Sequence, residues 1–390
     1  MSLYNRLKID MSVADELSFN PYYIATKSHK SGSFEIDKKQ YVDLASNDYL
    51  GLSTDKRVLQ GSFDAQNDFG ASLCGTPIAT GNSMRFSTLA DRLAGFAGVE
   101  SAVLFPSCFQ ANTSLFTSIA GVEDVILIDQ FAHASLIQGV KSVGCKVMPF
   151  LHNNCDHLEK LLKRTSKYRD VFVVTESVFS TEGSIAPYDK ITGLCDQYNA
   201  TAVIDDSHGI GVLGENGRGV LEHFNIENYK GIYTASLGKA LANSGGMIGG
   251  PKEFIDYLRY GCPGLIYSTA LIPSAVGGLE SVLDIIETEF SDLRDKLEKN
   301  REILHNSLVH NGFTVIGNSK SIISVRCGSM KDTIELAKTF FNYGMITTPF
   351  VEPSVPVNKG VLRIIPGAGI SIERCEDIAE IIKKNILGIS

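Results

Sequence analysis

The sequence predicts an α/β protein, with a mostly parallel sheet in a large domain and a smaller α+β domain toward the C-terminus. Between about residues 95 and 250, short β-branched runs alternate with longer helical patterns, which is typical of βα units around a parallel sheet. From about residue 282 the pattern changes to a charged amphipathic segment, 290–300. With 390 residues, of which 44% are hydrophobic, the chain is long enough for two domains. We expect an N-terminal segment over 1–50, a large domain over 51–281 and a small domain over 282–390.

The large domain contains five expected strands, at 101–105, 125–128, 146–150, 171–175 and 202–205. The small domain contains expected strands at 321–326 and around 362–365, a turn-rich stretch at 351–360, and a closing helix with Ile378, Ile381 and Ile382 on one face. Ligands of parallel sheets bind beyond the carboxyl ends of the strands. The residues that follow the strands are therefore candidates for a site: 106–109, 129–133, Glu176 and 205–208.

Composition excludes several classes of function. A formal net charge of -8 and a pI near 5.6 argue against nucleic acid as a partner. Residues 1–10 lack a signal-peptide pattern and no later segment is apolar for long enough to span a bilayer, so we expect a cytoplasmic protein. Eight scattered cysteines without a CxxC pair indicate reduced thiols. The segment 152–157 collects metal-ligand types without the spacing of a zinc site, so we expect a hydrogen-bonded turn there and no metal.

Two residues point to an aldehyde cofactor. Lys239 ends the tetrad 236–239 among small residues, and a lysine amine captures an aldehyde as a Schiff base. Asp205 ends an apolar run, where a carboxylate needs a cationic partner such as a protonated pyridine nitrogen. A lysine after glycine is more often part of a surface turn, and an aspartate there is often a helix cap. The two together nevertheless predict pyridoxal 5'-phosphate.

Neighbouring residues strengthen this interpretation. His208 would reach the phenolic oxygen of the cofactor ring, and His133 would lie flat on the face of the ring. The stretch 107–112 leads from a strand into a helix, whose N-terminal N–H groups suit a phosphate. The segment 209–214 matches the dinucleotide fingerprint G-x-G-x-x-G, but turn formers follow it where a helix would be needed. A dinucleotide-dependent oxidoreductase is therefore only a remote alternative.

As an ordered series, the motifs resemble the α-oxoamine synthase family of fold-type I pyridoxal phosphate enzymes over nearly the whole chain. The matching stretches are 46–52, 131–136, 150–154, 175–180, 205–209, 236–240, 266–269 and 355–363. The resemblance implies a large domain with a sheet of the seven-stranded type. It also implies that Lys239 carries the cofactor, that Asp205 pairs with the ring nitrogen, and that His133 stacks on the ring.

The same resemblance assigns the remaining candidates. His208 and Ser180 would contact the oxygen side of the ring. Ser268 and Thr269 would reach the phosphate of a neighbouring subunit, which implies a homodimer with shared active sites. The full set of cofactor-binding candidates is Cys108, Phe109, His133, Glu176, Ser180, Asp205, His208, Ser236, Lys239, Ser268 and Thr269, of which Lys239, His133, Asp205 and His208 are the catalytic candidates. The substrate-binding candidates are Asn47, Ser354 and Arg363.

The implied reaction joins an amino acid to an acyl-CoA with loss of CO2 and gives an α-amino ketone and coenzyme A. The stretches 209–219 and 355–363 look most like the 8-amino-7-oxononanoate synthase branch, which implies L-alanine and a pimeloyl-type thioester. The segment 18–23 has no arginine where that branch often carries one, and 148–158 and 234–239 resemble autoinducer synthases of the same family. A signalling or other long-chain amino ketone synthase is thus the alternative. Glycine C-acetyltransferase, serine palmitoyltransferase and a carrier protein in place of CoA stay open. A cofactor-binding regulator would need a fused module, for which the short, non-basic N-terminal stretch offers no room.

Overall fold

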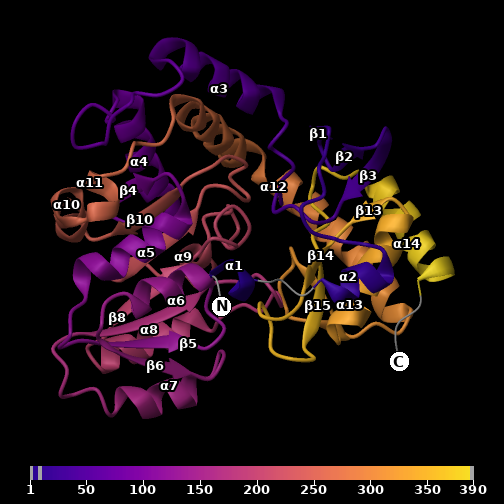
Figure 1. Ribbon diagram of the computed structural model, residues 1–390. Helices are drawn as coiled ribbons and strands as arrows, with labels where there is room; N and C mark the ends of the chain where they lie inside the picture. The colour runs from indigo at the N-terminus through magenta and orange to yellow at the C-terminus, as the bar shows by residue number, and fades with distance from the viewer. Residues whose placement is uncertain (1–2, 8–10, 387–390) are drawn as a thin grey trace. The chain divides into compact units, whose positions relative to one another are not determined.

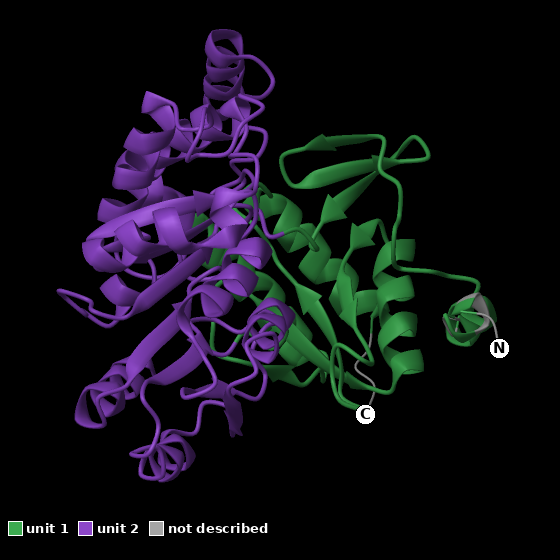
Figure 2. Ribbon diagram, turned by 60° about the vertical axis from the view of Figure 1, so that its left-hand side comes forward, with its two compact units in different colours: residues 1–46, 181–183, 296–390 green, residues 47–180, 184–295 purple. Residues whose placement is uncertain are grey.

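The computed structural model describes residues 3–7 and 11–386, and it forms two compact units (Figure 2). Unit 1 comprises 1–46, 181–183 and 296–390, and unit 2 comprises 47–180 and 184–295. The two units are connected through the long helix α12 (Pro273–His310), whose first part belongs to unit 2 and whose last part belongs to unit 1. Each unit has its own sheets and core.

Unit 2 is built on a seven-stranded sheet with the order β4-β10-β9-β8-β7-β5-β6. Its strands are β4 (Ser101–Phe105), β5 (Val125–Asp129), β6 (Lys146–Phe150), β7 (Val171–Glu176), β8 (Thr201–Asp205), β9 (Ile232–Ser236) and β10 (Gly246–Gly250). Neighbours β9-β8-β7-β5-β6 pair in parallel, whereas β10 runs antiparallel to both β4 and β9. The five strands expected from the sequence are confirmed, and so is the mostly parallel seven-stranded sheet.

Side chains point alternately to the two faces of this sheet, and both faces are buried. Every second residue, such as Val103 and Phe105 on β4 or Ile126 and Ile128 on β5, packs in one core with the apolar sides of α5, α6 and α10. Helices α4 and α8 contact the strands β4 and β8 (Figure 1). The helices of unit 2 besides α12 are α3 (Lys56–Phe69), α4 (Met84–Ala97), α5 (Cys108–Ile119), α6 (Ala134–Lys141), α7 (Cys155–Leu162), α8 (Tyr188–Gln197), α9 (Val220–His223), α10 (Lys252–Gly261) and α11 (Pro263–Ile266).

Side-chain caps decide where many of the helices begin. Each cap residue accepts a hydrogen bond from a backbone N–H of the first turn, which otherwise has no partner within the helix. Six such residues are Asp55 before α3, Ser83 before α4, Ser107 before α5, Asn154 before α7, Ser329 before α13 and Ser371 before α14. At the start of α6, the ring of His133 takes this position by accepting from the N–H of Ser135. A candidate site residue therefore also begins a helix.

Unit 1 contains two four-stranded sheets, β1-β2-β3-β13 and β11-β12-β15-β14. Its strands are β1 (Ser28–Lys30), β2 (Ser33–Ile36), β3 (Lys39–Asp43), β11 (Val315–Ile316), β12 (Ile323–Gly328), β13 (Met345–Ile346), β14 (Thr348–Phe350) and β15 (Gly360–Ile364). Its helices besides α12 are α1 (Leu3–Arg6), α2 (Ser12–Leu17), α13 (Met330–Asn342) and α14 (Ile372–Asn385). The predicted closing helix is confirmed as α14, in which Ile378 and Ile382 are buried and Ile381 packs against the same core.

The topology of unit 2 brings the candidate residues to one edge of its sheet. The carboxyl ends of parallel strands lie at the same edge. Because β10 is antiparallel to both its neighbours, β4 also points the same way as β9, and Gly246 at the start of β10 lies opposite Phe105 and Ser236. The residues after β4, β5, β7, β8 and β9 therefore meet at one edge.

Within residues 3–7 and 11–386, no helix has the length and apolar character that crossing a membrane requires.

Candidate active site

A cavity of about 310 Å³ opens at this edge of the unit 2 sheet. Seven of the sequence-predicted cofactor residues line it: Cys108, Phe109, His133, Glu176, Asp205, Ser236 and Lys239. They lie at the carboxyl ends of the strands β4, β5, β7, β8 and β9 or in the connections that follow these strands. The structure therefore brings together residues that lie up to 131 positions apart in the sequence, whereas their assigned roles stay predictions.

The N-terminus of α5 forms one wall of the cavity. Ser107 caps the helix by accepting the N–H of Gln110, at 3.1 Å, so the N–H groups of Cys108 and Phe109 belong to the open first turn. The start of β10 lies close behind, because a Cβ on Gly246 would come within 2.4 Å of the backbone nitrogen of Cys108. This helix end offers backbone donors and a favourable dipole to an anion.

Ser207 connects the helix end with the lysine loop. Its hydroxyl lies 3.4 Å from the thiol of Cys108 and accepts the backbone N–H of Ser236 at 2.9 Å. The hydroxyl of Ser236 in turn accepts the N–H of Gly238, at 3.2 Å. Burial raises the pKa of the Cys108 thiol, and the negative charge of Asp205 adds to this effect. The thiol is therefore a neutral packing group rather than a nucleophile.

Two carboxyl groups stand side by side on adjacent strands. Glu176 and Asp205 are paired in the register of β7 and β8, and each is only 4% exposed. Glu176 accepts the backbone N–H of His133 at 2.6 Å, and Oδ1 of Asp205 accepts that of Ser207 at 3.0 Å. Burial and the charge of Asp205 raise the pKa of the Glu176 carboxyl well above its ordinary value. In the sequence-based prediction, Asp205 is the carboxylate that pairs with the protonated ring nitrogen of the cofactor.

Hydrogen bonds link Asp205 to His133 through two other side chains. Nδ2 of Asn112 donates to Oδ2 of Asp205 at 2.7 Å and to the hydroxyl of Ser135 at 3.0 Å. That hydroxyl lies 2.8 Å from Nδ1 of His133. Both Asn112 and Ser135 are 1% exposed, whereas the ring of His133 is exposed at the cavity. The surrounding protein lowers the pKa of His133 by desolvation, although solvent at the open side weakens this effect.

Lys239 lies on a tight loop between the antiparallel strands β9 and β10. The loop is closed by hydrogen bonds from the N–H of Leu237 to the carbonyl of Gly245, at 3.0 Å, and from the N–H of Ala242 to the carbonyl of Lys239, at 2.8 Å. Gly245 has a φ of +119°, which side chains rarely adopt. The loop therefore holds the lysine on the cavity wall opposite the strand ends.

Five predicted residues of unit 2 lie elsewhere. His208 does not line this cavity, and its Nδ1 lies 2.7 Å from the hydroxyl of Tyr49. Asn47, two residues before this tyrosine, has a buried Oδ1 without a hydrogen-bond partner among the described residues. Ser268 and Thr269 do not line the cavity either, and neither does Ser180.

The two remaining substrate candidates belong to unit 1. Arg363 lies in β15 and is 6% exposed, with its guanidinium carbon 5.0 Å from the centre of the Phe350 ring. Ser354 is exposed in the turn between β14 and β15, where its N–H donates to the carbonyl of Val351 at 2.9 Å. Their predicted contact with an amino acid stays a prediction.

Two sequence-based alternatives are also resolved. The predicted turn covers only the first part of the segment 152–157, because residues 152–153 form a turn and Cys155 begins α7. Nδ1 of His157 accepts the N–H of Leu151 at 3.0 Å, and His152 lies 3.0 Å from both Asp129 and Ser184. The glycine-rich stretch 209–219 forms turns before the short helix α9, so the fingerprint does not open a helix. Among the residues that the structure covers, no group of three or more possible metal ligands occurs.

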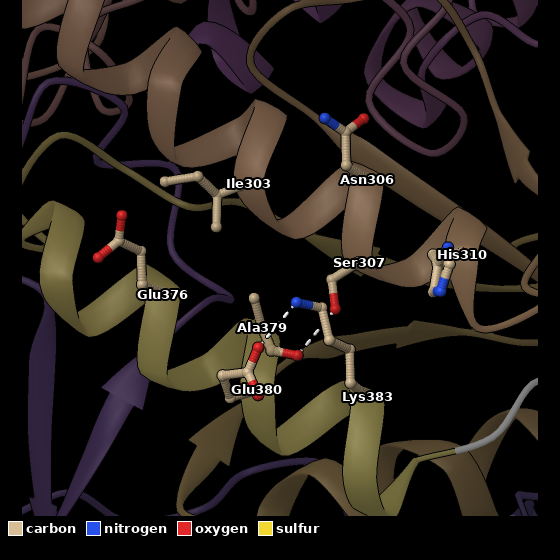
Figure 3. A pocket seen from close by; sticks show the side chains of 8 residues that line it. All are labelled: Ile303, Asn306, Ser307, His310, Glu376, Ala379, Glu380 and Lys383. Carbon is tan, nitrogen blue, oxygen red and sulfur yellow. Dashed lines mark hydrogen bonds and ion pairs between the residues drawn. The ribbon is translucent and has the colours of Figure 1, made fainter.

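A larger hollow of about 550 Å³ lies in unit 1 between α12 and α14 (Figure 3). Its side chains bond among themselves or with the backbone: Ser307 donates to the carbonyl of Ala379 at 2.8 Å, and Lys383 pairs with Glu380 at 2.7 Å. None of the sequence-predicted site residues lines this hollow. The smaller cavity of unit 2 is therefore the candidate site.

Sequence reasoning missed several polar residues around the cavity, namely Asn243 and Ser244 of the β9–β10 loop and four others. Ser107, Asn112, Ser135 and Ser207 all line it, but the motifs that contain them suggested no role for them individually. They share one signal, because each is a hydroxyl or amide residue within the first turn or two after a predicted strand.

The chain is similar to several known proteins over most of its length. Residues 39–382 match the family model described as aminotransferase class I and II. An 8-amino-7-oxononanoate synthase of Bacillus pumilus is 30% identical, covering 92% of this chain and 91% of that protein. A 2-amino-3-ketobutyrate coenzyme A ligase of Escherichia coli is 33% identical, covering 93% and 91%. Among solved structures, a serine palmitoyltransferase of Sphingomonas wittichii has a TM-score of 0.89 at 26% identity, covering 96% and 98%.

Proposed function

Because the chain belongs to the aminotransferase class I and II family, and within it to the α-oxoamine synthases, which are pyridoxal phosphate enzymes, we propose that it condenses L-alanine with an acyl-CoA. The products are an α-amino ketone, coenzyme A and CO2, and a pimeloyl-type acyl group is the favoured partner. The observation that carries the proposal is the single cavity where Lys239, Asp205 and His133 meet the N-terminus of α5.

The chemistry of the cavity walls fits the cofactor. The first-turn N–H groups of Cys108 and Phe109, with the hydroxyl of Ser236, suit a phosphate. Asp205 is a buried carboxylate that a protonated pyridine nitrogen would neutralise. Lys239 supplies the amine that captures the aldehyde. When bound, pyridoxal phosphate withdraws electrons from the α-carbon of an amino acid, which lets the α-proton and later the carboxylate leave.

We assign the remaining roles to individual side chains. We assign to the amine of Lys239 the removal of the α-proton and its return after CO2 is lost. We assign to the imidazole of His133 the support of the ring face. The α-carbon forms its new bond to the thioester carbonyl, and coenzyme A leaves as a thiolate that takes up a proton.

Substrate binding is assigned by the family motifs. The guanidinium of Arg363 is suited to a carboxylate, because its planar fork binds both oxygens at once. Asn47 has an amide oxygen that is buried without a hydrogen-bond partner among the described residues, which is consistent with a role in binding a polar ligand. Ser354 completes the proposed set on the amino acid side.

The proposal includes a homodimer. Ser268 and Thr269 would serve the phosphate of the neighbouring subunit, and they lie outside the cavity of their own chain. The flanking side chains of Tyr267 and Ile272 are 84% and 45% exposed. Exposed apolar side chains around two polar residues suit a surface that a second copy of the chain covers.

A second candidate differs only in its substrates. The Escherichia coli relative named 2-amino-3-ketobutyrate coenzyme A ligase is similar to this chain over nearly the same share of its length as the Bacillus pumilus synthase. Glycine with acetyl-CoA is therefore the alternative pair. An autoinducer synthase or another long-chain amino ketone synthase is a further alternative from the motifs at 148–158 and 234–239.

Release of free thiol tests the proposal directly. Purified protein loaded with pyridoxal phosphate is incubated with each of several amino acids and with acyl-CoA of increasing chain length. We expect thiol release that requires an amino acid and is greatest for alanine with a medium-length acyl group. Preference for glycine with acetyl-CoA would select the second candidate, and no release with any pair would contradict α-oxoamine synthase activity. The Lys239→Ala variant is the negative control.

A further inference from the structure

We propose that Asn112 and Ser135 are positioning residues that form one hydrogen-bonded relay between Asp205 and His133, and that this relay holds His133 as the neutral tautomer with its proton on Nε2. The inference rests on the proposed function, because Asp205 and His133 are assigned to the cofactor there. Neither Asn112 nor Ser135 was a candidate from the sequence. The argument depends only on which groups are able to donate and which only accept.

The donor and acceptor roles along the relay follow from Asp205, where the chain of hydrogen bonds begins. A carboxylate only accepts hydrogen bonds, so the amide group that faces Oδ2 of Asp205 at 2.7 Å must be the NH2 of Asn112. This sets the orientation of the amide. Its second N–H then points to the hydroxyl oxygen of Ser135 at 3.0 Å. Ser135 is therefore an acceptor from Asn112, and its own proton is available for a different partner.

The same reasoning assigns the donors and the acceptor at His133. Nδ1 of His133 lies 2.8 Å from the hydroxyl oxygen of Ser135 and 3.3 Å from the backbone nitrogen of the same residue. The backbone N–H only donates, and the hydroxyl proton is directed to the same ring nitrogen. Two donors converge on Nδ1, so Nδ1 carries the lone pair. The proton of the neutral ring is then on Nε2.

The relay also opposes protonation of His133. An imidazolium carries a proton on Nδ1, which would oppose the backbone N–H of Ser135 and would require the Ser135 hydroxyl to turn from donor to acceptor. Three titratable groups face this ring from neighbouring elements: Glu176 from β7, Asp205 from β8 and Lys239 from the β9–β10 loop. Asp205 favours the imidazolium and Lys239 disfavours it. Desolvation is the largest effect on the pKa of His133 and disfavours the imidazolium, and the relay acts in the same direction by placing a backbone donor at Nδ1.

The destabilising effect of a buried, unpartnered oxygen supports a functional role for Asn112. Oδ1 of Asn112 is buried without a hydrogen-bond partner among the described residues. An unpartnered buried acceptor destabilises a fold, and an apolar residue of similar size would avoid this. The amide is therefore retained for its two donors rather than for stability. Through them, the position of the Asp205 carboxylate and the tautomer of His133 depend on the same side chain.

The test uses ¹⁵N-histidine NMR of the protein loaded with pyridoxal phosphate, with the His133 signals assigned by His133→Gln. Wild type should show Nδ1 as an unprotonated nitrogen and Nε2 as a protonated one. Ser135→Ala keeps the backbone N–H but removes the hydroxyl, so the ring should show both tautomers and its midpoint of titration should rise by about one pH unit. Ser135→Thr should restore the wild-type signals. Ser142→Ala at the other end of α6, where the hydroxyl bonds only to the carbonyl of Gly139, is the matched control.

Asn112→Leu provides a second, independent readout. It removes both donors, so the dissociation constant of pyridoxal phosphate, measured from the visible absorption of the complex, should rise roughly tenfold or more. His133 signals in Ser135→Ala that equal those of wild type would overturn the relay, as would unchanged cofactor affinity in Asn112→Leu. If wild type shows the predicted tautomer but releases no thiol with any substrate pair, the relay stands and the proposed function fails.

Discussion

The hydroxyl of Tyr49 lies 2.7 Å from Nδ1 of His208, and the two side chains are 0% and 3% exposed. Their rings meet edge to face, with centroids 6.1 Å apart and planes at 77°. A phenol donates readily, so the contact favours a histidine that accepts at Nδ1 and carries its proton on Nε2. The motif at 46–52 and the histidine after β8 are thus joined in unit 2, although 159 positions separate them.

We expect Tyr49→Phe to destabilise the protein by about 1–3 kcal/mol, because a buried ring nitrogen loses this partner. The free energy of unfolding is measured by urea denaturation. If His208 contacts the cofactor, as the sequence predicts, the pH midpoint of the visible absorption band should also shift. Tyr260→Phe, at a side chain that is 76% exposed, is the control and should change neither quantity. A Tyr49→Phe variant as stable as this control would mean that the hydrogen bond has no net effect.

Lys239→Ala should abolish the visible absorption band that pyridoxal phosphate acquires on binding, because no other amine is assigned to the aldehyde. Thiol release should fall by about a thousandfold or more, since the general base is removed as well. Lys230→Ala, in an exposed residue just before β9, is the matched control and should keep both. A band that persists in Lys239→Ala would show that a different lysine carries the cofactor.

The parts of the fold that depend on local pattern were predictable from the sequence. All five expected strands of unit 2 appear, because β-branched runs bounded by turn formers predict buried parallel strands. The edge at which Asp205 and His133 meet also followed from strand direction, whereas Lys239 was identified from its motif. Neither β9 nor β10 was predicted, and the small residues of Gly246–Gly250 in β10 have little strand propensity. Its place is set by tertiary packing, because only glycine fits so near the backbone of Cys108.

The hydrogen-bonded partners within the site were not predictable. Asn112 and Ser135 lie on consecutive helices, α5 and α6, and nothing in either motif indicates that their side chains meet. Tyr49 and His208 are still farther apart in the sequence. Periodicity identifies which face of an element is buried, but it does not identify the polar partner of a given atom, which depends on how the elements pack.

Arg363→Lys should raise the KM for the amino acid by about tenfold to a hundredfold, because an ammonium cannot hold both oxygens of a carboxylate as a guanidinium does. The visible absorption of the bound cofactor should remain, since Arg363 is assigned to the substrate. Steady-state kinetics with the amino acid as the varied substrate measure the change. Arg326→Lys, at an exposed position of the adjacent strand β12, should leave KM unaltered. Loss of the cofactor band in Arg363→Lys would assign this residue to the cofactor instead.

Asp206 should make the protein less stable as the pH rises from about 4 to 7. The carboxyl is fully buried, and burial raises its pKa from 3.8 to about 7 even though Tyr233 donates to it at 2.8 Å and the N–H of Val220 at 2.9 Å. Between these pH values the folded state binds a proton that the unfolded state has released, so the free energy of unfolding falls with rising pH, by up to about 4 kcal/mol, and then levels off. Asp206→Asn keeps an acceptor for both donors without a charge.

The difference in the free energy of unfolding between Asp206→Asn and wild type isolates this effect, because the contributions of the other titrating groups cancel. The variant should match wild type near pH 4 and exceed its free energy of unfolding above pH 7. Urea denaturation at a series of pH values gives the two curves. A constant difference across the range would mean that Asp206 does not titrate there.

Two glycines offer a matched pair for the packing behind the candidate phosphate site. A Cβ on Gly246 would lie 2.4 Å from the backbone nitrogen and Cα of Cys108, which are rigid atoms of a helix start. Gly246→Ala should therefore push the N-terminus of α5 away, and it should both lower the midpoint temperature of unfolding and weaken the binding of pyridoxal phosphate.

Gly95 is the matched control, because it lies in α4 and a Cβ there meets nothing within 4 Å. Gly95→Ala should stabilise the protein by roughly 0.5–1 kcal/mol, because alanine is the better helix former, and should leave cofactor affinity as it is. If Gly246→Ala loses stability but binds the cofactor normally, the helix end is not the phosphate site and the assignment of Cys108 and Phe109 fails.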